Sequence, residues 1–232
     1  MRLANAAWLA AGAAELVAPT RCAGCDLPGA LLCDRCRRAV RAIDSARACP
    51  SCGAPGGVRW CGECAGEAYA FDAVRCAGVF EGPLARAVRL HKDAAEHRLA
   101  SVLARLTADV LGDWARWADA LVPVPPSPRA FARRGSDHTA RLACEVAVLL
   151  RLPALDALRC MPRRDQRGLT REKRLANAAG SIRAVPGVAI PPRVLVLDDV
   201  LTTGATLSAA AKALRDAGAT EVRAVAVARS CG

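Results

Sequence analysis

The pattern of hydrophobic and polar positions divides the chain into a Cys-rich first part and a longer second part. Before about residue 66 the sequence is rich in Cys, Gly and Pro and lacks an apolar period that could build a core. After it, short apolar runs predict strands, and longer stretches with helical periodicity predict helices. Strands that alternate with helices favour a parallel sheet with helices on both faces. We therefore expect an α/β domain preceded by a small Cys-rich module.

The expected elements of the second part follow one another in a regular order. Strands are expected at 71–80, 121–124, 155–159, 194–197 and 222–229, with helices within 84–117 and at 139–150 and 207–217.

Three segments fall outside this alternation. Residues 125–135 predict a basic, turn-rich loop, and residues 161–181 are dense in Arg without an apolar stripe, which indicates an excursion from the fold. Residues 3–18 are apolar but too short to span a bilayer, and they carry Glu15. They predict a short amphipathic helix that packs on the body of the protein, and we expect a cytoplasmic protein with no membrane span.

Length and charge narrow the function only a little. A chain of 232 residues can hold one α/β domain and a small appendage. The formal net charge of +11 indicates affinity for phosphate groups, whether on a nucleotide, a pyrophosphate or a polynucleotide.

Cysteine spacing supplies the first chemical prediction. Of twelve cysteines, eight fall in four C-x-x-C pairs, and in a cytosolic protein this favours metal over disulfides. A thioredoxin-like redox motif would need one such pair at a helix start, not four in series. Two structural Cys₄ zinc sites would use all eight thiols, with sequential and interleaved pairing both open. The ligands would be Cys22, Cys25, Cys33, Cys36, Cys49, Cys52, Cys61 and Cys64.

The remaining Cys and the His residues match no metal pattern. We expect most of the other cysteines to be small apolar residues, and the histidines to lie at the surface or in packing positions. These residues are Cys76, Cys144, Cys160 and Cys231, and His91, His97 and His138.

The segment from Val194 to Thr206 carries the strongest pattern in the chain. Its apolar run ends in Asp198 and Asp199, just past the carboxyl end of a predicted strand, where ligands of open α/β sheets bind. Hydroxyls and backbone N–H groups follow at a helix N-terminus and could cradle a phosphate. They belong to Thr202, Thr203, Gly204, Ala205 and Thr206. The plainer interpretation is a helix cap and a turn without a ligand.

The whole order of this segment resembles the signature of type I phosphoribosyltransferases, which bind 5-phosphoribosyl 1-pyrophosphate (PRPP). The resemblance implies that Asp198 and Asp199 hold the ribose hydroxyls, that residues 202–206 wrap the 5′-phosphate, and that Mg²⁺ bridges pyrophosphate and ribose oxygens. Arg133 and Arg134 follow another strand, where this fold holds the pyrophosphate. The Arg-rich excursion could be a lid over PRPP, a nucleic-acid surface or a solvated loop. As a lid, it would use Arg164, Gln166, Arg171 and Arg174.

With the Cys-rich module included, nearly the whole chain resembles the ComF family, which pairs a zinc module with a phosphoribosyltransferase-like domain. Further matching segments are 17–22, 90–92, 122–125 and 134–135, with Arg159, Gln166, Leu169, Arg174 and Asn177. The chain departs from the family at Ser136, Asp137 and His138, and again at Arg163 in the excursion, and these changes are expected to leave the ribose-phosphate site untouched. The family implies a link to DNA uptake or the use of imported DNA.

Two functional hypotheses follow. The first is a PRPP-binding, phosphoribosyltransferase-like protein with an unidentified acceptor and no evident general base. The second is a non-catalytic accessory protein that binds single-stranded DNA on the same fold, in contact with DNA-uptake proteins. The expected organisation is a helix over 1–19, a double zinc module over 20–66 and the phosphoribosyltransferase-like domain over 67–232.

Overall fold

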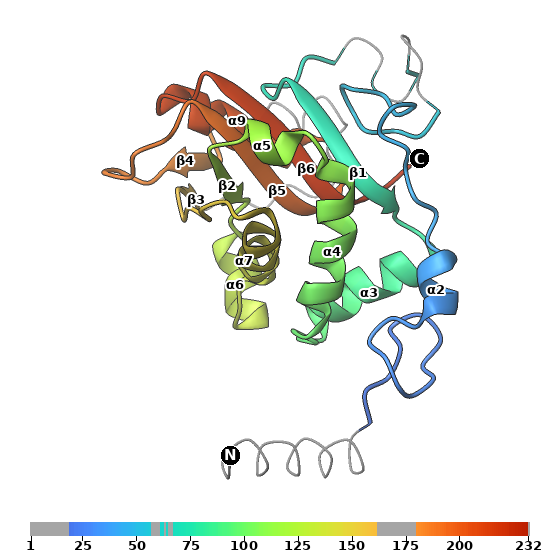
Figure 1. Cartoon of the computed structure of the whole chain (residues 1–232). Coiled ribbons are helices and arrows are strands. Elements are labelled where there is room, and N and C mark those ends of the chain that lie inside the picture. The colour runs from blue at the N-terminus through green and yellow to red at the C-terminus, as the bar shows by residue number, and fades with distance from the viewer. Residues whose placement is uncertain (1–18, 57–60, 63, 65–66, 162–179, 232) are drawn as a thin grey trace.

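The centre of the fold is a four-stranded parallel sheet in the order β1-β6-β5-β2 (Figure 1). Its strands are β1 (Ala73–Val79), β2 (Ala120–Pro123), β5 (Arg193–Leu201) and β6 (Glu221–Arg229). The computed structural model describes residues 19–56, 61–62, 64, 67–161 and 180–231. The predicted α/β architecture with a parallel sheet is confirmed. The predicted N-terminal helix lies outside the described residues, except for Pro19.

The sheet separates two hydrophobic cores. Alternate residues of β5 point to opposite faces, so Val194 and Val196 lie in one core and Leu195 and Leu197 in the other. All four of these side chains are fully buried, which explains why the strand reads as a continuous apolar run.

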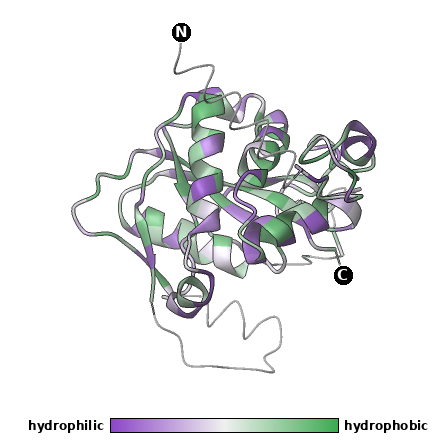
Figure 2. Ribbon diagram, turned by 90° about the horizontal axis from the view of Figure 1, so that it is seen from below, coloured by the Kyte–Doolittle hydropathy of each residue, from purple (hydrophilic) through white to green (hydrophobic). Residues whose placement is uncertain are grey.

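One face of the sheet is covered by α3 (Gly82–Asp93), α4 (Leu99–Leu111) and α7 (His138–Leu150). The stretch 84–117 was expected to be helical, and the structure divides it into α3, α4 and the short α5 (Trp114–Trp117). The breaks coincide with left-handed backbone at Ala95 (φ 53°) and Gly112 (φ 50°), which no α-helix accommodates. Helices in Figure 2 carry both hydrophobic and hydrophilic stretches, as expected for elements with one buried side.

The other face is covered by α9 (Ala205–Asp216) and by a small antiparallel sheet of β3 (Leu158–Cys160) and β4 (Ile182–Ala184). The strand expected at 155–159 is divided. Leu155 N donates to Leu121 O of β2 at 2.9 Å, beside an isolated parallel bridge between Ala154 and Leu121, whereas Leu158 and Arg159 belong to the small antiparallel sheet. Strand β4 was not predicted, because three residues are too few to show a period.

The prediction of a basic, turn-rich loop over 125–135 was wrong in its structure, because α6 (Pro128–Arg134) occupies most of it. Pro128 is tolerated in the first turn, where a missing N–H costs nothing. The Ser127 hydroxyl caps the helix by accepting from Ala130 N at 3.2 Å. Gly135 ends it with left-handed backbone at φ 70°. The residues taken as turn signals are thus the start and stop of a short helix.

The Cys-rich module packs against the edge of the sheet. After the short helix α2 (Asp34–Arg38), the chain runs antiparallel to β1, where Ile43 N donates to Ala77 O at 3.2 Å and Val79 N donates to Arg41 O at 2.9 Å. This contact covers an otherwise exposed strand edge. Among the described helices, none combines the length and the apolar character that a bilayer span requires.

Candidate functional site

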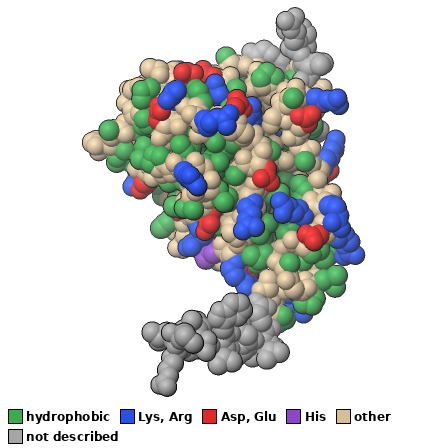
Figure 3. Space-filling view, in the orientation of Figure 1, with side chains coloured by type: hydrophobic (Ala, Val, Ile, Leu, Met, Phe, Trp, Pro, Cys, Tyr) green, Lys and Arg blue, Asp and Glu red, His purple; other side chains and the backbone are tan. Residues whose placement is uncertain are grey.

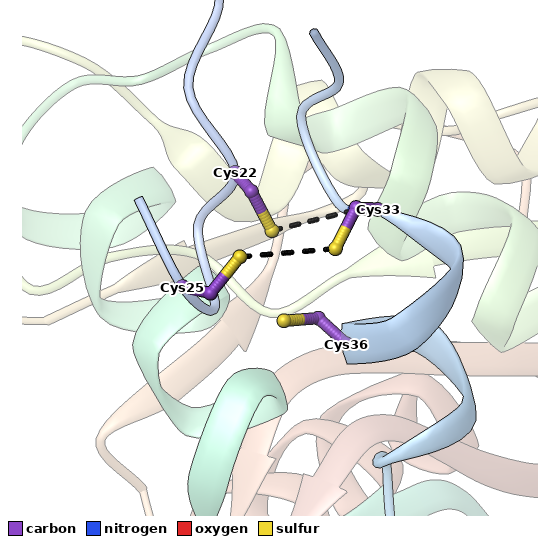
Figure 4. A group of neighbouring side chains, drawn as sticks. All are labelled: Cys22, Cys25, Cys33 and Cys36. Atoms are coloured by element: carbon purple, nitrogen blue, oxygen red, sulfur yellow. Dashed lines mark hydrogen bonds between the residues drawn. The ribbon is translucent and has the colours of Figure 1, made fainter. Parts of the chain in front are cut away.

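The eight thiols of the C-x-x-C pairs gather into two separate groups of four. Figure 4 shows the first group, in which the side chains of Cys22, Cys25, Cys33 and Cys36 point toward a common centre. The second group has the same composition and consists of Cys49, Cys52, Cys61 and Cys64. Of the two pairings that the sequence left open, the structure has the sequential one.

The geometry of both groups fits a tetrahedral zinc ion. Four sulfurs about 2.3 Å from one ion stand about 3.8 Å apart. In the first group, the sulfurs of Cys25 and Cys33 are 3.8 Å apart. In the second, two sulfur pairs are each separated by 3.6 Å. With every position of the tetrahedron taken by a thiol, these groups suit structural ions and leave no open position for catalysis.

The backbone around the first group favours a thiolate. Gly24 N and Cys33 N lie 3.4 and 3.3 Å from the Cys22 sulfur. Burial alone would raise the pKa of Cys22, but these backbone N–H groups outweigh burial and lower it to about 6. Gly24 also leaves the necessary room, because a Cβ there would lie 2.6 Å from the Cys36 sulfur.

The signature segment lies at the carboxyl end of the sheet, but its strand is longer than predicted. Strand β5 continues to Leu201, and Asp198 pairs with Ala226 of β6. Both acids are therefore strand residues, and adjacent strand residues point to opposite faces. Asp199 faces α3 and α7, whereas Asp198 shares the face of Val196.

Asp199 is buried and held by two side chains from other elements. Its Oδ2 accepts from Lys92 Nζ at 2.6 Å and lies 3.0 Å from His138 Nε2. Its Oδ1 accepts from Val200 N at 2.7 Å. Burial alone would raise the pKa of this carboxyl, but the contacts with His138 and Lys92 outweigh burial and hold the pKa below its usual range. Asp199 is thus an ionised, oriented carboxylate.

The pKa of Asp198 is shifted in the opposite direction to that of Asp199. Its Oδ1 accepts from the backbone N–H of Asp199 at 2.8 Å. Burial, followed by the charge of the neighbouring Asp199, raises the pKa of Asp198 well above its usual value. The adjacent acids therefore differ, with Asp199 already saturated by protein donors and Asp198 better able to accept from a ligand.

The loop after β5 presents backbone donors. Gly204 is left-handed at φ 79° and is the N-cap of α9, whose twelve residues begin at Ala205. Ala205 N lies 3.4 Å from the Thr203 hydroxyl. Within the described part of the chain, the N–H groups of Thr203 and Gly204 have no acceptor. Unpaired N–H groups beside a helix N-terminus are suited to an anion.

The histidines have a more specific placement than the sequence indicated. All three gather together, with the His91 ring centroid 6.4 Å from that of His97 and 6.2 Å from that of His138. His91 Nε2 lies 3.2 Å from the His138 carbonyl, so it ties α3 to the start of α7. His138 then contacts Asp199, which makes it a site residue. The expectation that the departure at 136–138 leaves the site untouched was wrong.

The predicted arginines have different surroundings. Arg134 lies near the acids, where its Nε donates to Asp93 Oδ1 at 3.1 Å, one residue from Lys92. Arg133 is exposed on α6. Arg159, the middle residue of β3, pairs with Asp156. The predicted lid residues Arg164, Gln166, Arg171 and Arg174 lie outside the described residues.

A cavity of about 270 Å³ lies elsewhere, between α9 and β4. Its walls include Ile182, Ala209 and Ala213. It follows the carboxyl-terminal half of α9 and does not include the acids or the Thr/Gly loop.

Sequence comparison relates the chain to two proteins of known name. It is 28% identical over 213 residues to Competence protein F of Haemophilus influenzae, a match that covers 86% of this chain and 90% of that protein. It is 29% identical over 110 residues to Competence protein ComFC of Streptococcus pneumoniae, covering 47% of each chain.

Two solved structures resemble part of the chain. Orotate phosphoribosyltransferase from Aeropyrum pernix is 24% identical with a TM-score of 0.35, and the match covers 57% of this chain and 60% of the other. Purine phosphoribosyltransferase from Pyrococcus horikoshii is 17% identical with a TM-score of 0.33, covering 57% of this chain and 83% of the other.

A family model described as the phosphoribosyl transferase domain matches residues 191–230. The match begins just before β5 and ends just after β6. It includes both acids, the Thr/Gly loop and α9.

Proposed function

Since the chain belongs to the ComF family, we propose that it binds PRPP, together with Mg²⁺, at the carboxyl end of β5. The observation that carries this proposal is the pairing of acceptors and donors in one continuous segment. Asp198 and Asp199 supply carboxylates, and a few residues later Thr203 and Gly204 supply unpaired N–H groups. A ribose 5-phosphate has hydroxyls that can donate to the carboxylates and a phosphate that can accept from the N–H groups.

The two acids would have different tasks. Asp198 would accept hydroxyl hydrogens of the ribose, because one of its oxygens carries no protein donor among the described contacts. Asp199 would act mainly by its charge and by holding Lys92 and His138. Lys92 and Arg134 both lie on this side of the site, where a ligand with many negative charges is attracted. Arg134 and the exposed Arg133 remain the proposed contacts for pyrophosphate.

The acidic residues of the site suit a Mg²⁺ ion that is bound together with PRPP. They are less suited to a Mg²⁺ ion that the protein would hold without a ligand. Both oxygens of Asp199 already have protein donors. Mg²⁺ usually keeps several waters and binds phosphate oxygens with one or two carboxylates. When bound, the ion would neutralise part of the pyrophosphate charge. Asp198 is the carboxylate best placed to contact it.

Transfer of the ribose 5-phosphate is a further part of the proposal. It would break the bond between the anomeric carbon and pyrophosphate and form one to a nucleophilic acceptor. Release of pyrophosphate in the presence of candidate acceptors is the assay that identifies the acceptor.

Binding is tested by isothermal titration with PRPP and Mg²⁺. Saturable heat is expected for the natural chain and a loss of affinity of at least tenfold for Asp198→Asn, which removes the ribose acceptor. Asp216→Asn, at the exposed end of α9, is the matched control and should bind normally. Identical isotherms for the natural chain and Asp198→Asn would remove the ribose assignment.

The names of the two relatives and the net charge support a role in DNA uptake or the use of imported DNA. On the face shown in Figure 3, Lys and Arg side chains are spread among acidic ones. We therefore propose DNA binding only as an accessory property, tested by the salt dependence of single-stranded DNA affinity; a flat salt response would count against it. Eight free thiols in zinc-like geometry suit the reducing cytoplasm.

A further inference from the structure

The second Cys₄ group and the signature loop share one buried cation. Arg229, the last residue of β6, is only 2% exposed. Its Nε donates to the carbonyl oxygen of Cys52 at 2.7 Å, and its Nη1 donates to that of Thr202 at 2.9 Å. The same nitrogen also donates to Ser230 O. One guanidinium therefore fixes a metal-ligand residue and the first loop residue relative to each other.

Tyr69 makes a second connection between the same two places. Its ring packs against the second Cys₄ group and stacks on Phe71 with centroids 4.9 Å apart. Its hydroxyl donates to the carbonyl oxygen of Thr203 at 3.2 Å. The ring also fills the space beside Gly204, where a Cβ would lie 2.6 Å from it. The loop thus rests on an aromatic side chain that the Cys₄ group supports.

These contacts determine where the loop's N–H groups point. In a trans peptide the C=O and the following N–H point in opposite directions. Arg229 holds the carbonyl of Thr202, and Tyr69 holds that of Thr203. The N–H groups of Thr203 and Gly204 therefore point away from the Cys₄ group. Neither of these two N–H groups has an acceptor within the described residues.

The first Cys₄ group has no such connection among the described contacts. It packs against α4 through Val102 and Leu106, and Arg86 donates to Gly24 O at 3.1 Å. In Figure 1 this part of the chain (blue) lies beside α2 and α3. The two groups have the same ligands but different neighbours, so each is a natural control for the other.

We propose that the second Cys₄ group controls anion binding at the signature loop, with Arg229 and Tyr69 as the positioning residues that connect them. This inference rests on the proposed function, in which the loop binds the 5′-phosphate of PRPP. A metal ion at the second group would hold Cys52 and Tyr69 in place and so keep the two N–H groups directed at the phosphate. Loss of that ion would weaken phosphate binding, whereas loss of the ion at the first group would leave it unchanged.

The sole tyrosine of the chain makes a direct test available. The full chain carrying 3-fluorotyrosine has one ¹⁹F resonance, that of Tyr69, and PRPP with Mg²⁺ should shift it. Cys61→Ser removes a ligand from the second group and should move the resonance without any ligand present. Cys25→Ser is the matched change in the first group and should leave it in place. Zinc content and circular dichroism establish that each variant has lost one ion and kept the α/β fold.

Affinity for PRPP provides the second readout. Arg229→Met removes the hydrogen bonds to Cys52 O and Thr202 O and should weaken binding about tenfold, which corresponds to about 1.4 kcal/mol. Arg229→Lys keeps a donor and should recover part of the affinity, which a purely steric role would not predict. Tyr69→Phe loses only the hydroxyl and should weaken binding less than Arg229→Met. These variants decide the question if Cys61→Ser does not fold.

The outcomes separate this inference from the proposed function. If the natural chain binds PRPP and the variants Arg229→Met and Cys61→Ser bind it equally well, the coupling is wrong and the ligand assignment stands. If the natural chain binds no PRPP, the ligand assignment is wrong. The coupling is then judged by the ¹⁹F resonance alone, and an unmoved Tyr69 signal in Cys61→Ser overturns it.

Discussion

The Lys92 ammonium lies 2.6 Å from Oδ2 of Asp199, with the two side chains 29% and 5% exposed. This pair joins the end of α3 to the signature strand and sets the charge of the acid. Because His138 reaches the same oxygen from α7, elements from three parts of the chain meet at a single carboxylate. The signature is therefore supported by residues far outside it.

Replacing Lys92 by Met should destabilise the fold by about 1–3 kcal/mol at pH 7, because a buried carboxylate loses a charged donor. The sign of the pH dependence follows from the lowered pKa of Asp199. A depressed pKa stabilises the fold above the unfolded value of about 4, and this stabilisation is lost as the pH falls through the folded value. Urea unfolding should therefore show the full difference at pH 5 to 7 and a shrinking one below about pH 4.

The control for this change is Lys212→Met. Lys212 and Asp216 form an exposed pair one helical turn apart on α9, at 2.9 Å. Such pairs contribute less than about 0.5 kcal/mol. Equal losses from Lys92→Met and Lys212→Met would show that Asp199 does not depend on its buried partner.

Asp198→Asn should make the protein more stable near neutral pH while it loses ribose binding. The raised pKa of Asp198 means that the folded chain binds this proton more tightly than the unfolded chain. Stability is then lost as the pH rises above the unfolded value of about 4 and through the folded value. Asn carries no charge and still accepts from Asp199 N, so a gain of about 1 kcal/mol is expected at pH 7.5 and none at pH 4.

Urea unfolding of both proteins across this pH range measures the gain. A gain that is the same at pH 4 and pH 7.5 would point to packing instead of charge. Asp216→Asn should give no comparable gain.

The sequence was sufficient for those parts of the site that are contiguous. The strand, both acids and the Thr/Gly loop follow one another without a gap, and each C-x-x-C pair places two thiols within one turn. Lys92, His138, Tyr69 and Arg229 could not be found in this way. They reach the site only because β5 lies between β6 and β2 in the sheet, and strand order depends on long-range packing that no local period reports.

Helix α6 and strand β4 were not predicted, and the physical reason is the same for both. Helix α6 spans only Pro128–Arg134 and has no buried residue, so it shows no apolar stripe. Strand β4 has three residues. Neither is long enough for periodicity to outweigh the turn-forming residues that flank it. The capping pattern of Ser127, Pro128 and Gly135 was the signal that could have identified α6.

Removal of metal should unfold the Cys-rich module. The chain is expected to carry two zinc ions, and Cys36→Ser to carry one, because each group of four thiols holds one ion. Structural zinc sites contribute about 10–16 kcal/mol of apparent binding energy, and in the described part of the Cys-rich module the short α2 is the one regular element. Metal analysis by mass spectrometry, and circular dichroism before and after a chelator, check both statements.

Cys144→Ser is the control for zinc content. Cys144 is exposed on α7 and belongs to neither group, so this variant should keep both ions. A chain that retains its full spectrum and stability after losing both ions would contradict a structural role for the metal.

Arg75→Met should destabilise the fold without affecting the ligand site. Arg75 Nη1 donates to Leu111 O at 2.6 Å at the end of α4, and its guanidinium lies 4.3 Å from the ring centroid of Trp114. Losing a charged hydrogen bond and a largely buried cation–π contact should cost about 2 kcal/mol in urea unfolding. Arg89→Met, whose exposed guanidinium lies 5.0 Å from the Phe80 ring, is the matched control and should cost less than about 1 kcal/mol. PRPP affinity should stay unchanged in Arg75→Met, because Arg75 faces the end of α4 and does not contact the acids or the loop. A loss of affinity would show that the ligand site depends on the packing between α4 and the sheet.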